Sequence, residues 1–147
     1  MREQNHPPVI LDSAVVLAYA VHGDRVRYTG REATYHNGLL VGPDVKRSAI
    51  CRNLAQPHDY LFFYCSENWS VQAAVGHDTL DAARAYASRM YSGIEHALVE
   101  TAHSAAAIET AVEAYWEGRR CAVCGKWPHE VEHLERKEMG WVCGECA

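Results

Sequence analysis

The sequence contains no long hydrophobic segment. Although 48% of its 147 residues are hydrophobic, polar residues interrupt every apolar run before it reaches the roughly 18 residues that a membrane-spanning helix requires. Asp12 interrupts the apolar residues near the start of the sequence. No positively charged segment precedes them and no small-residue cleavage site follows them, so this segment is better interpreted as a strand than as a signal peptide. The sequence therefore predicts a cytoplasmic protein without a membrane partner.

Positive charge is also scarce. The chain has 14 Lys and Arg against 19 Asp and Glu, a formal net charge of −5, and the balance is acidic both in residues 1–120 and in residues 121–147. Proteins that bind nucleic acids usually carry a basic patch that neutralises phosphates. We therefore expect no nucleic-acid partner, and a protein with a basic or neutral surface suits the charge better.

Catalytic sequence motifs are missing as well. The sequence has no phosphate-binding loop, no GxSxG, no HExxH and no GxGxxG. Single candidates exist, because His58–Asp59 and His77–Asp78 fall in turns beside strands, and Glu67 and Trp69 follow Cys65 closely. We predict that the protein is not an enzyme. A small hydrolase or transferase with an unrecognised active site in residues 1–120 is the alternative.

Residues 9–77 do contain a series of short β-type segments. Residues 9–20 are rich in Val and Ala and predict one buried central strand. Asn37–Gly38 separates two short segments, and this pair is the strongest two-residue hairpin signal because both residues accept positive φ. Three further segments follow, at residues 47–54, 60–66 and 70–77. About six strands joined by short turns predict an antiparallel meander with one face that needs a cover.

Two amphipathic helical segments supply that cover. The first begins after Asp78 or Thr79, either of which can cap it, and the second begins after Ser104. Residues 94–103 fit either an extension of the first helix or a strand that returns to the sheet, and the fresh cap at Ser104 favours the strand. The predicted fold class is α+β: a mostly antiparallel sheet covered by two helices, in a domain of residues 1–120.

Two of the six cysteines lie inside apolar strand-like segments. Cys51 and Cys65 have no partner at a motif spacing, and we expect them to be small buried thiols. In a chain of this kind, cysteines serve as metal ligands and core residues more often than as disulfides.

The other four cysteines form two CxxC pairs near the end of the sequence. Cys121, Cys124, Cys143 and Cys146 offer four sulfur ligands from two tight turns, which is the ligand set of a structural zinc site. A closed four-cysteine site leaves no position for a catalytic water, and its ion replaces a core that about 27 residues cannot build. We predict one structural Zn²⁺ in a zinc-ribbon or treble-clef-like module, residues 121–147, that packs against the larger domain.

Other residues of this module bear on its geometry. Gly125 and Gly144 each follow a cysteine, and we expect both to adopt backbone conformations that glycine tolerates best. His129 and His133 are the competing ligands, but the four cysteines already complete the coordination shell.

The motif of this segment reads C-x-x-C-G-K, then E-V-x-x-L, then W-V-C-x-E-C. Its positions are Cys121, Cys124, Gly125, Lys126, Glu130, Val131, Leu134, Val142, Cys143, Glu145 and Cys146. The segment resembles the ClpX-type C4 zinc-binding domain. This resemblance implies the four zinc ligands and a module that recognises adaptor and substrate proteins. Because the sequence has no Gly-x₄-Gly-Lys-Ser/Thr loop, the unfoldase activity of that family is excluded.

The module also carries more large apolar side chains than its size can bury. Trp127, Val131, Leu134 and Trp141 are the candidates for a surface that contacts either the larger domain or another protein. We predict a non-catalytic protein–protein interaction protein, which is an adaptor, a regulator or an immunity-type inhibitor whose acidity steers it to a basic target. The oligomeric state is left open.

Overall fold

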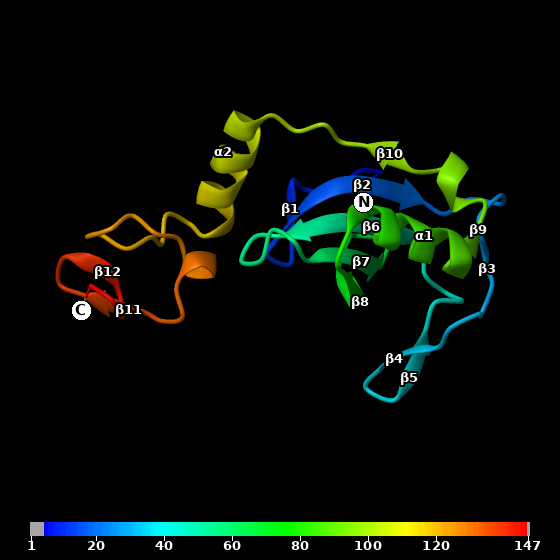
Figure 1. Cartoon of the computed structure of the whole chain (residues 1–147), viewed down its shortest axis with the longest axis horizontal. Helices are drawn as coiled ribbons and strands as arrows, with labels where there is room; N and C mark the ends of the chain where they lie inside the picture. The colour runs from blue at the N-terminus through cyan, green and yellow to red at the C-terminus, as the bar shows by residue number, and fades with distance from the viewer. Residues whose placement is uncertain (1–4, 147) are drawn as a thin grey trace. The chain divides into compact units, whose positions relative to one another are not determined.

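The computed structural model describes residues 5–146 of the chain (Figure 1). The chain divides into two compact units, Met1–Ala102 and His103–Ala147. The predicted zinc module, residues 121–147, lies inside the second unit, and its boundary at residue 121 stays a prediction. None of the helices in the described part of the chain is long and apolar enough to span a membrane.

The first unit is built on an antiparallel sheet with the strand order β1-β2-β6-β7-β8. These strands are β1 (Ile10–Leu11), β2 (Ala14–Val21), β6 (Arg47–Asn53), β7 (Tyr60–Cys65) and β8 (Val71–His77). After a short 3-10 helix, η1 (Ile94–His96), strand β10 (Val99–Glu100) pairs antiparallel with β2. The α+β fold is confirmed, and the strand alternative holds for the end of residues 94–103.

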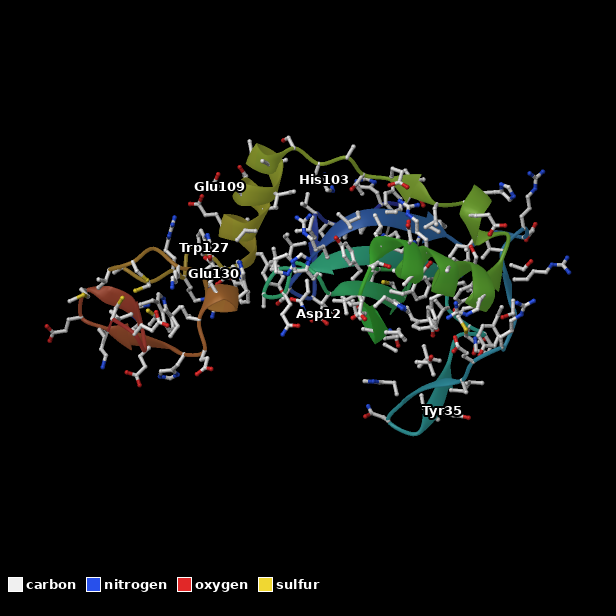
Figure 2. The ribbon with its side chains drawn as sticks, in the orientation of Figure 1. Asp12, Tyr35, His103, Glu109, Trp127 and Glu130 are labelled. Carbon is white, nitrogen blue, oxygen red and sulfur yellow. The ribbon has the colours of Figure 1, made fainter. Side chains whose placement is uncertain are left out.

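The prediction of a single strand over residues 9–20 is wrong. A two-residue turn at Asp12 and Ser13 folds β1 back onto β2, and both turn residues have positive φ, 45° and 62°. Figure 2 shows Asp12 at this turn. A register shift between Val16 and Ala18 then twists β2, so that these two side chains belong to the cores on opposite faces of the sheet.

The chain between β2 and β6 leaves the main sheet, so the predicted meander is wrong in this part. Two separate ribbons form there, β3 (Arg27–Tyr28) with β9 (Tyr91–Ser92) and β4 (Thr34–His36) with β5 (Leu39–Val41). The predicted hairpin turn at Asn37–Gly38 is confirmed, because φ is positive at both residues, 51° and 79°. Figure 2 shows Tyr35 on this hairpin, where it is exposed.

Helix α1 (Leu80–Met90) covers one face of the main sheet. Thr79 caps this helix, since its hydroxyl accepts a hydrogen bond of 3.0 Å from the N–H of Ala82. The helix contributes Ala83, Tyr86, Ala87 and Met90 to a buried cluster with Ala18, Ala20, Ile50, Phe62 and Tyr64 of the sheet. The spacing of the four helical residues places them on one side of the helix.

The opposite face of the sheet has a second core, which includes Trp69. Cys51 and Cys65 are fully buried in it, as predicted. Burial raises the pKa of the Cys51 thiol well above its usual value and the pKa of Cys65 to about 12. Both thiols are therefore protonated near neutral pH and act as small core side chains.

The second unit contains helix α2 (Ala105–Tyr115), the 3-10 helix η2 (Pro128–Glu130) and a hairpin of β11 (Leu134–Lys137) and β12 (Gly140–Cys143). Ser104 caps α2 by accepting a 3.1 Å hydrogen bond from the N–H of Ala107, as the sequence predicts. Just after α2, the indole N–H of Trp116 donates to Nδ1 of His129 at 3.1 Å, and the two rings stack. This contact ties the end of α2 to the segment that carries the cysteines.

Candidate metal centre

The two CxxC pairs converge in the second unit. The sulfur atoms of Cys121, Cys124, Cys143 and Cys146 all lie within 4.8 Å of one another. The sulfurs of Cys124 and Cys143 are 3.7 Å apart. A tetrahedral zinc ion with sulfur at about 2.3 Å requires sulfur–sulfur edges of about 3.8 Å. The four cysteines are therefore positioned to hold one metal ion.

The first pair forms a tight turn that the backbone closes. The N–H of Cys121 donates to the carbonyl of Lys126 at 2.8 Å, and the N–H of Gly125 donates to the carbonyl of Cys121 at 2.9 Å. Gly125 has a φ of 78°, in the left-handed region that glycine adopts without steric cost. The expectation for this glycine is confirmed.

The second pair begins at the end of the β11–β12 hairpin. Leu134 pairs with Cys143 in this hairpin, and the N–H of Cys146 donates to the carbonyl of Cys143 at 3.0 Å. The φ of Gly144 lies outside the left-handed region, so the expectation that this second glycine needs a special backbone conformation is wrong. Its N–H donates instead to the carbonyl of His133 at 3.1 Å, a bond that any residue except proline can make.

Backbone N–H groups also prepare one sulfur for metal binding. The N–H of Cys124 and the N–H of Cys143 point to the sulfur of Cys121, at 3.5 and 3.4 Å. These donors lower the pKa of the Cys121 thiol to about 6, because they stabilise the thiolate. Hydrogen bonds with the neighbouring sulfurs of Cys143 and Cys124 raise the pKa of Cys146 to about 12. A bound cation displaces that proton, so metal binding at this site is coupled to pH.

The cysteines form most of the buried interior around the site. Cys121, Val142 and Cys143 are buried, and Val131 and Leu134 are half-buried against them. Two of the four candidate contact residues thus support the site from inside. An apolar cluster of this size is too small to stabilise a fold by itself. Small modules of this kind usually need an additional support such as a structural metal ion.

Neither competing histidine belongs to the group of possible metal ligands. His129 is occupied by Trp116, and burial lowers its pKa, which suits the neutral ring that accepts the indole hydrogen bond. His133 lies 2.9 Å from a carboxylate oxygen of Glu135. Among the described residues, the four cysteines form the one group that meets the geometry of a metal site.

The two candidate tryptophans are half-buried, and arginines stack on both. The guanidinium of Arg120 lies 4.5 Å from the ring centre of Trp127, and those of Arg119 and Arg136 lie 6.0 and 5.8 Å from Trp141. Figure 2 shows Trp127 close to Glu130, and the backbone N–H of Trp127 donates to the Glu130 carboxylate at 2.9 Å. Sequence reasoning missed these arginines because their distances in sequence from the tryptophans follow no regular spacing.

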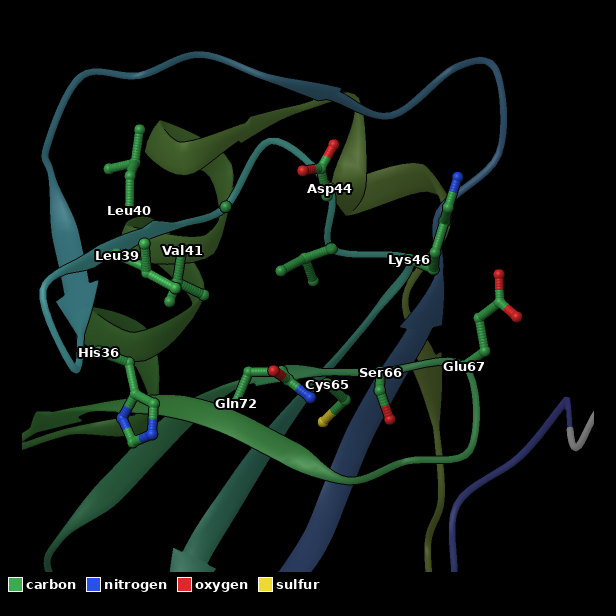
Figure 3. A pocket seen from close by; sticks show the side chains of 12 residues that line it. His36, Leu39, Leu40, Val41, Asp44, Lys46, Cys65, Ser66, Glu67 and Gln72 are labelled. Atoms are coloured by element: carbon green, nitrogen blue, oxygen red, sulfur yellow. The ribbon is translucent and has the colours of Figure 1, made fainter.

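The candidate acid–base residues of the first unit divide between two pockets. His58, Asp59 and Asp78 line a pocket of about 520 Å³. Cys65 and Glu67 line a different pocket of about 410 Å³, beside the β4–β5 hairpin. Figure 3 shows the apolar side chains Leu39, Leu40 and Val41 along this second pocket, with Lys46 and Glu67 toward one end.

The two remaining candidates, Trp69 and His77, pack against neighbouring side chains of the first unit. Trp69 is buried in the core described above. The His77 ring packs against Tyr86 with ring centres 4.9 Å apart, and burial, together with the positive charge of Arg89, lowers its pKa.

Comparisons with protein-family models, with curated proteins and with solved structures find no match for this chain. The likeness of residues 121–147 to the ClpX-type C4 domain is therefore carried by the motif residues alone.

Proposed function

We propose that the four cysteines bind one structural Zn²⁺, and that the surface which this ion holds rigid binds another protein without catalysis. The observation that carries the proposal is the closed set of four sulfurs, with one edge already at the length that a zinc–thiolate tetrahedron needs. Four thiolates satisfy zinc completely, so the ion has no open position for a substrate or an activated water.

Zinc is the ion that this ligand set favours. Soft thiolate ligands select zinc over magnesium and calcium, which prefer oxygen, and the tetrahedral four-sulfur arrangement is typical of structural zinc. The remaining soft competitors, iron and copper, are distinguished by measurement of the metal content.

Exposed apolar side chains support a binding role. Val123, between the first two cysteines, is 61% exposed, and Met139, at the tip of the β11–β12 hairpin, is 70% exposed. Together with the half-buried Trp127 and Trp141, they give a small module an apolar surface suited to protein contact. An adaptor, a regulator and an immunity-type inhibitor are the forms of this role that fit a small acidic protein, and the ClpX-type motif favours an adaptor.

The metal part of the proposal is tested by elemental analysis of the purified chain and by its Co²⁺-substituted form. We expect one zinc per chain and the absorption of a four-thiolate tetrahedral site. Cys124→Ser should lose the ion, whereas Cys51→Ser, which changes a buried thiol of the first unit, should keep it. Retention of one full equivalent by Cys124→Ser would rule out this ligand set.

The binding part is tested by affinity capture from native lysate with three baits: the wild type, Cys124→Ser and Cys51→Ser. A partner held by the wild type and by Cys51→Ser but lost by Cys124→Ser assigns the binding surface to the zinc module. A partner held equally by all three baits contradicts the proposal and assigns binding to the first unit.

A second candidate function is a small hydrolase or transferase in the first unit. The specific observation is that His58, Asp59 and Asp78, members of two separate sequence pairs, line one pocket. Chromogenic ester and phosphate substrates test this, with His58→Gln as the variant. Turnover by the wild type that His58→Gln abolishes would favour the enzyme, and no turnover of either substrate class would count against it.

A further inference from the structure

The structure contains a cluster of two arginines and one tryptophan in the second unit: Arg119, Arg136 and Trp141. Arg136 on β11 and Trp141 on β12 are directly opposite in the hairpin register. The guanidinium of Arg119 approaches the same ring, and its Nε donates to the carbonyl of Trp116 at 3.0 Å. The indole ring therefore holds two positively charged groups at its surface.

These arginines differ from Lys126 and Lys137 of the same unit in one respect. Lys126 lies 3.5 Å from a carboxylate oxygen of Glu145, and Lys137 lies 3.0 Å from one of Glu135. Within residues 5–146, no carboxylate forms an ion pair with Arg119 or Arg136. The arginine–tryptophan cluster thus presents positive charge that no carboxylate among the described residues neutralises through an ion pair.

Stacking makes this charge suitable for recognition. A guanidinium that lies near an aromatic face keeps its N–H edge available, and the edge matches the two oxygens of a carboxylate. The ring also restricts the side chain, so less conformational entropy is lost when a ligand binds. An apolar ligand side chain can cover the remaining surface of the half-buried Trp141.

We propose that the arginine–tryptophan cluster binds an acidic segment of the partner protein, in which Asp or Glu residues are interleaved with apolar ones. This inference rests on the proposed protein-binding function and specifies the chemistry of the partner. The acidic net charge of the chain favours a basic partner at long range, but charges separated by more than about 8 Å are largely screened at physiological salt. Contacts at the cluster are governed by the two guanidinium groups.

The experiment uses the full zinc-loaded chain and measures tryptophan fluorescence and anisotropy on titration with three labelled probes. These are a peptide of alternating Glu and Leu, a peptide of alternating Lys and Leu, and a single-stranded oligothymidine. The variants are Arg136→Gln and Lys137→Gln. They remove the same charge from successive residues of one strand, whose side chains point to opposite faces.

We expect the Glu–Leu peptide to bind, with an affinity that falls at higher salt. Arg136→Gln should weaken this binding about fivefold, the effect of losing one surface ion pair of about 1 kcal/mol. Lys137→Gln should leave the affinity unchanged, and both variants should keep one equivalent of zinc, which separates the loss of a contact from the loss of the fold.

Four results would overturn the inference. These are equal effects of the two substitutions, preference for the Lys–Leu peptide, preference for the oligothymidine, and failure of all three probes to bind. If the peptides fail while affinity capture still returns a partner that Cys124→Ser loses, the proposed function stands and the acidic chemistry alone is wrong.

Discussion

The turn between the first two cysteines allows a quantitative test with a matched control. Gly125 and Gly144 occupy similar places in the sequence, each directly after a cysteine. Only Gly125 lies in the left-handed backbone region, with a φ of 78°. Replacement of each glycine by alanine therefore adds the same methyl group to two different backbone conformations.

The expected cost follows from this difference. For a residue with a Cβ, the left-handed backbone conformation is about 1–2 kcal/mol less stable than the right-handed one. In Gly125→Ala the new Cβ would also meet Nη2 of Arg120 at 3.1 Å, but this atom is the end of a flexible side chain that can move away. In Gly144→Ala the nearest atom is Cβ of His133 at 4.0 Å, an ordinary contact. The backbone conformation thus decides the outcome.

Because metal binding and folding of the module are coupled, the cost should appear in zinc affinity. About 1.4 kcal/mol corresponds to a tenfold change. We expect Gly125→Ala to weaken zinc binding about tenfold, and Gly144→Ala to leave it unchanged or slightly tighter, since alanine also reduces the entropy of the unfolded chain. Competition with a chromophoric zinc chelator measures both values. Equal affinities for the two variants, or a larger loss in Gly144→Ala, would refute this account of the turn.

Three further predictions concern two side chains of the first unit and the response of both units to removal of the metal. Burial lowers the pKa of His22 from 6.5 to about 4. As the pH falls, His22 of the unfolded state therefore takes up its proton before His22 of the folded state. The free energy of unfolding, measured in urea, should be highest above about pH 6.5 and should fall toward pH 4. His22→Gln should weaken this pH dependence. Tyr64→Phe removes a buried 2.7 Å hydrogen bond to the hydroxyl of Tyr86. It should lower the free energy of unfolding, measured by chemical denaturation, by about 1 kcal/mol. An unchanged free energy of unfolding would mean that this bond makes no net contribution to stability. Removal of metal by a strong chelator should abolish hydrogen-exchange protection in β11 and β12 but not in β6 and β7, and equal loss in all four strands would contradict independent units.

Local patterns in the sequence were sufficient to predict several structural features. The spacing of the four cysteines was enough to predict that their sulfurs come together, because two CxxC turns place four sulfurs within reach of one ion. The Asn37–Gly38 hairpin and the helix cap at Ser104 were predicted from single residues whose side chains or backbone freedom determine a turn or a helix start. In each case the physical cause acts over a few neighbouring residues.

Strand boundaries and strand pairings were harder to predict from the sequence. Residues 9–20 read as one strand because apolar residues flank Asp12 and Ser13 on both sides, and the left-handed conformations of this pair leave no hydrophobic signal. The pairing of β2 with β6, across a gap of 25 residues, depends on which apolar faces fit together around the core. Periodicity within one segment carries no information about such a partner.

The same division holds for the candidate site. The sequence by itself predicted the four cysteines as candidate ligands and showed the excess of large apolar side chains in residues 121–147. Only the tertiary structure decided that Val131 and Leu134 face the cysteines while Arg119 and Arg136 meet at Trp141. These contacts join residues from different turns and strands, and their existence depends on how the hairpin and the first cysteine turn fold together, which no spacing along the chain encodes.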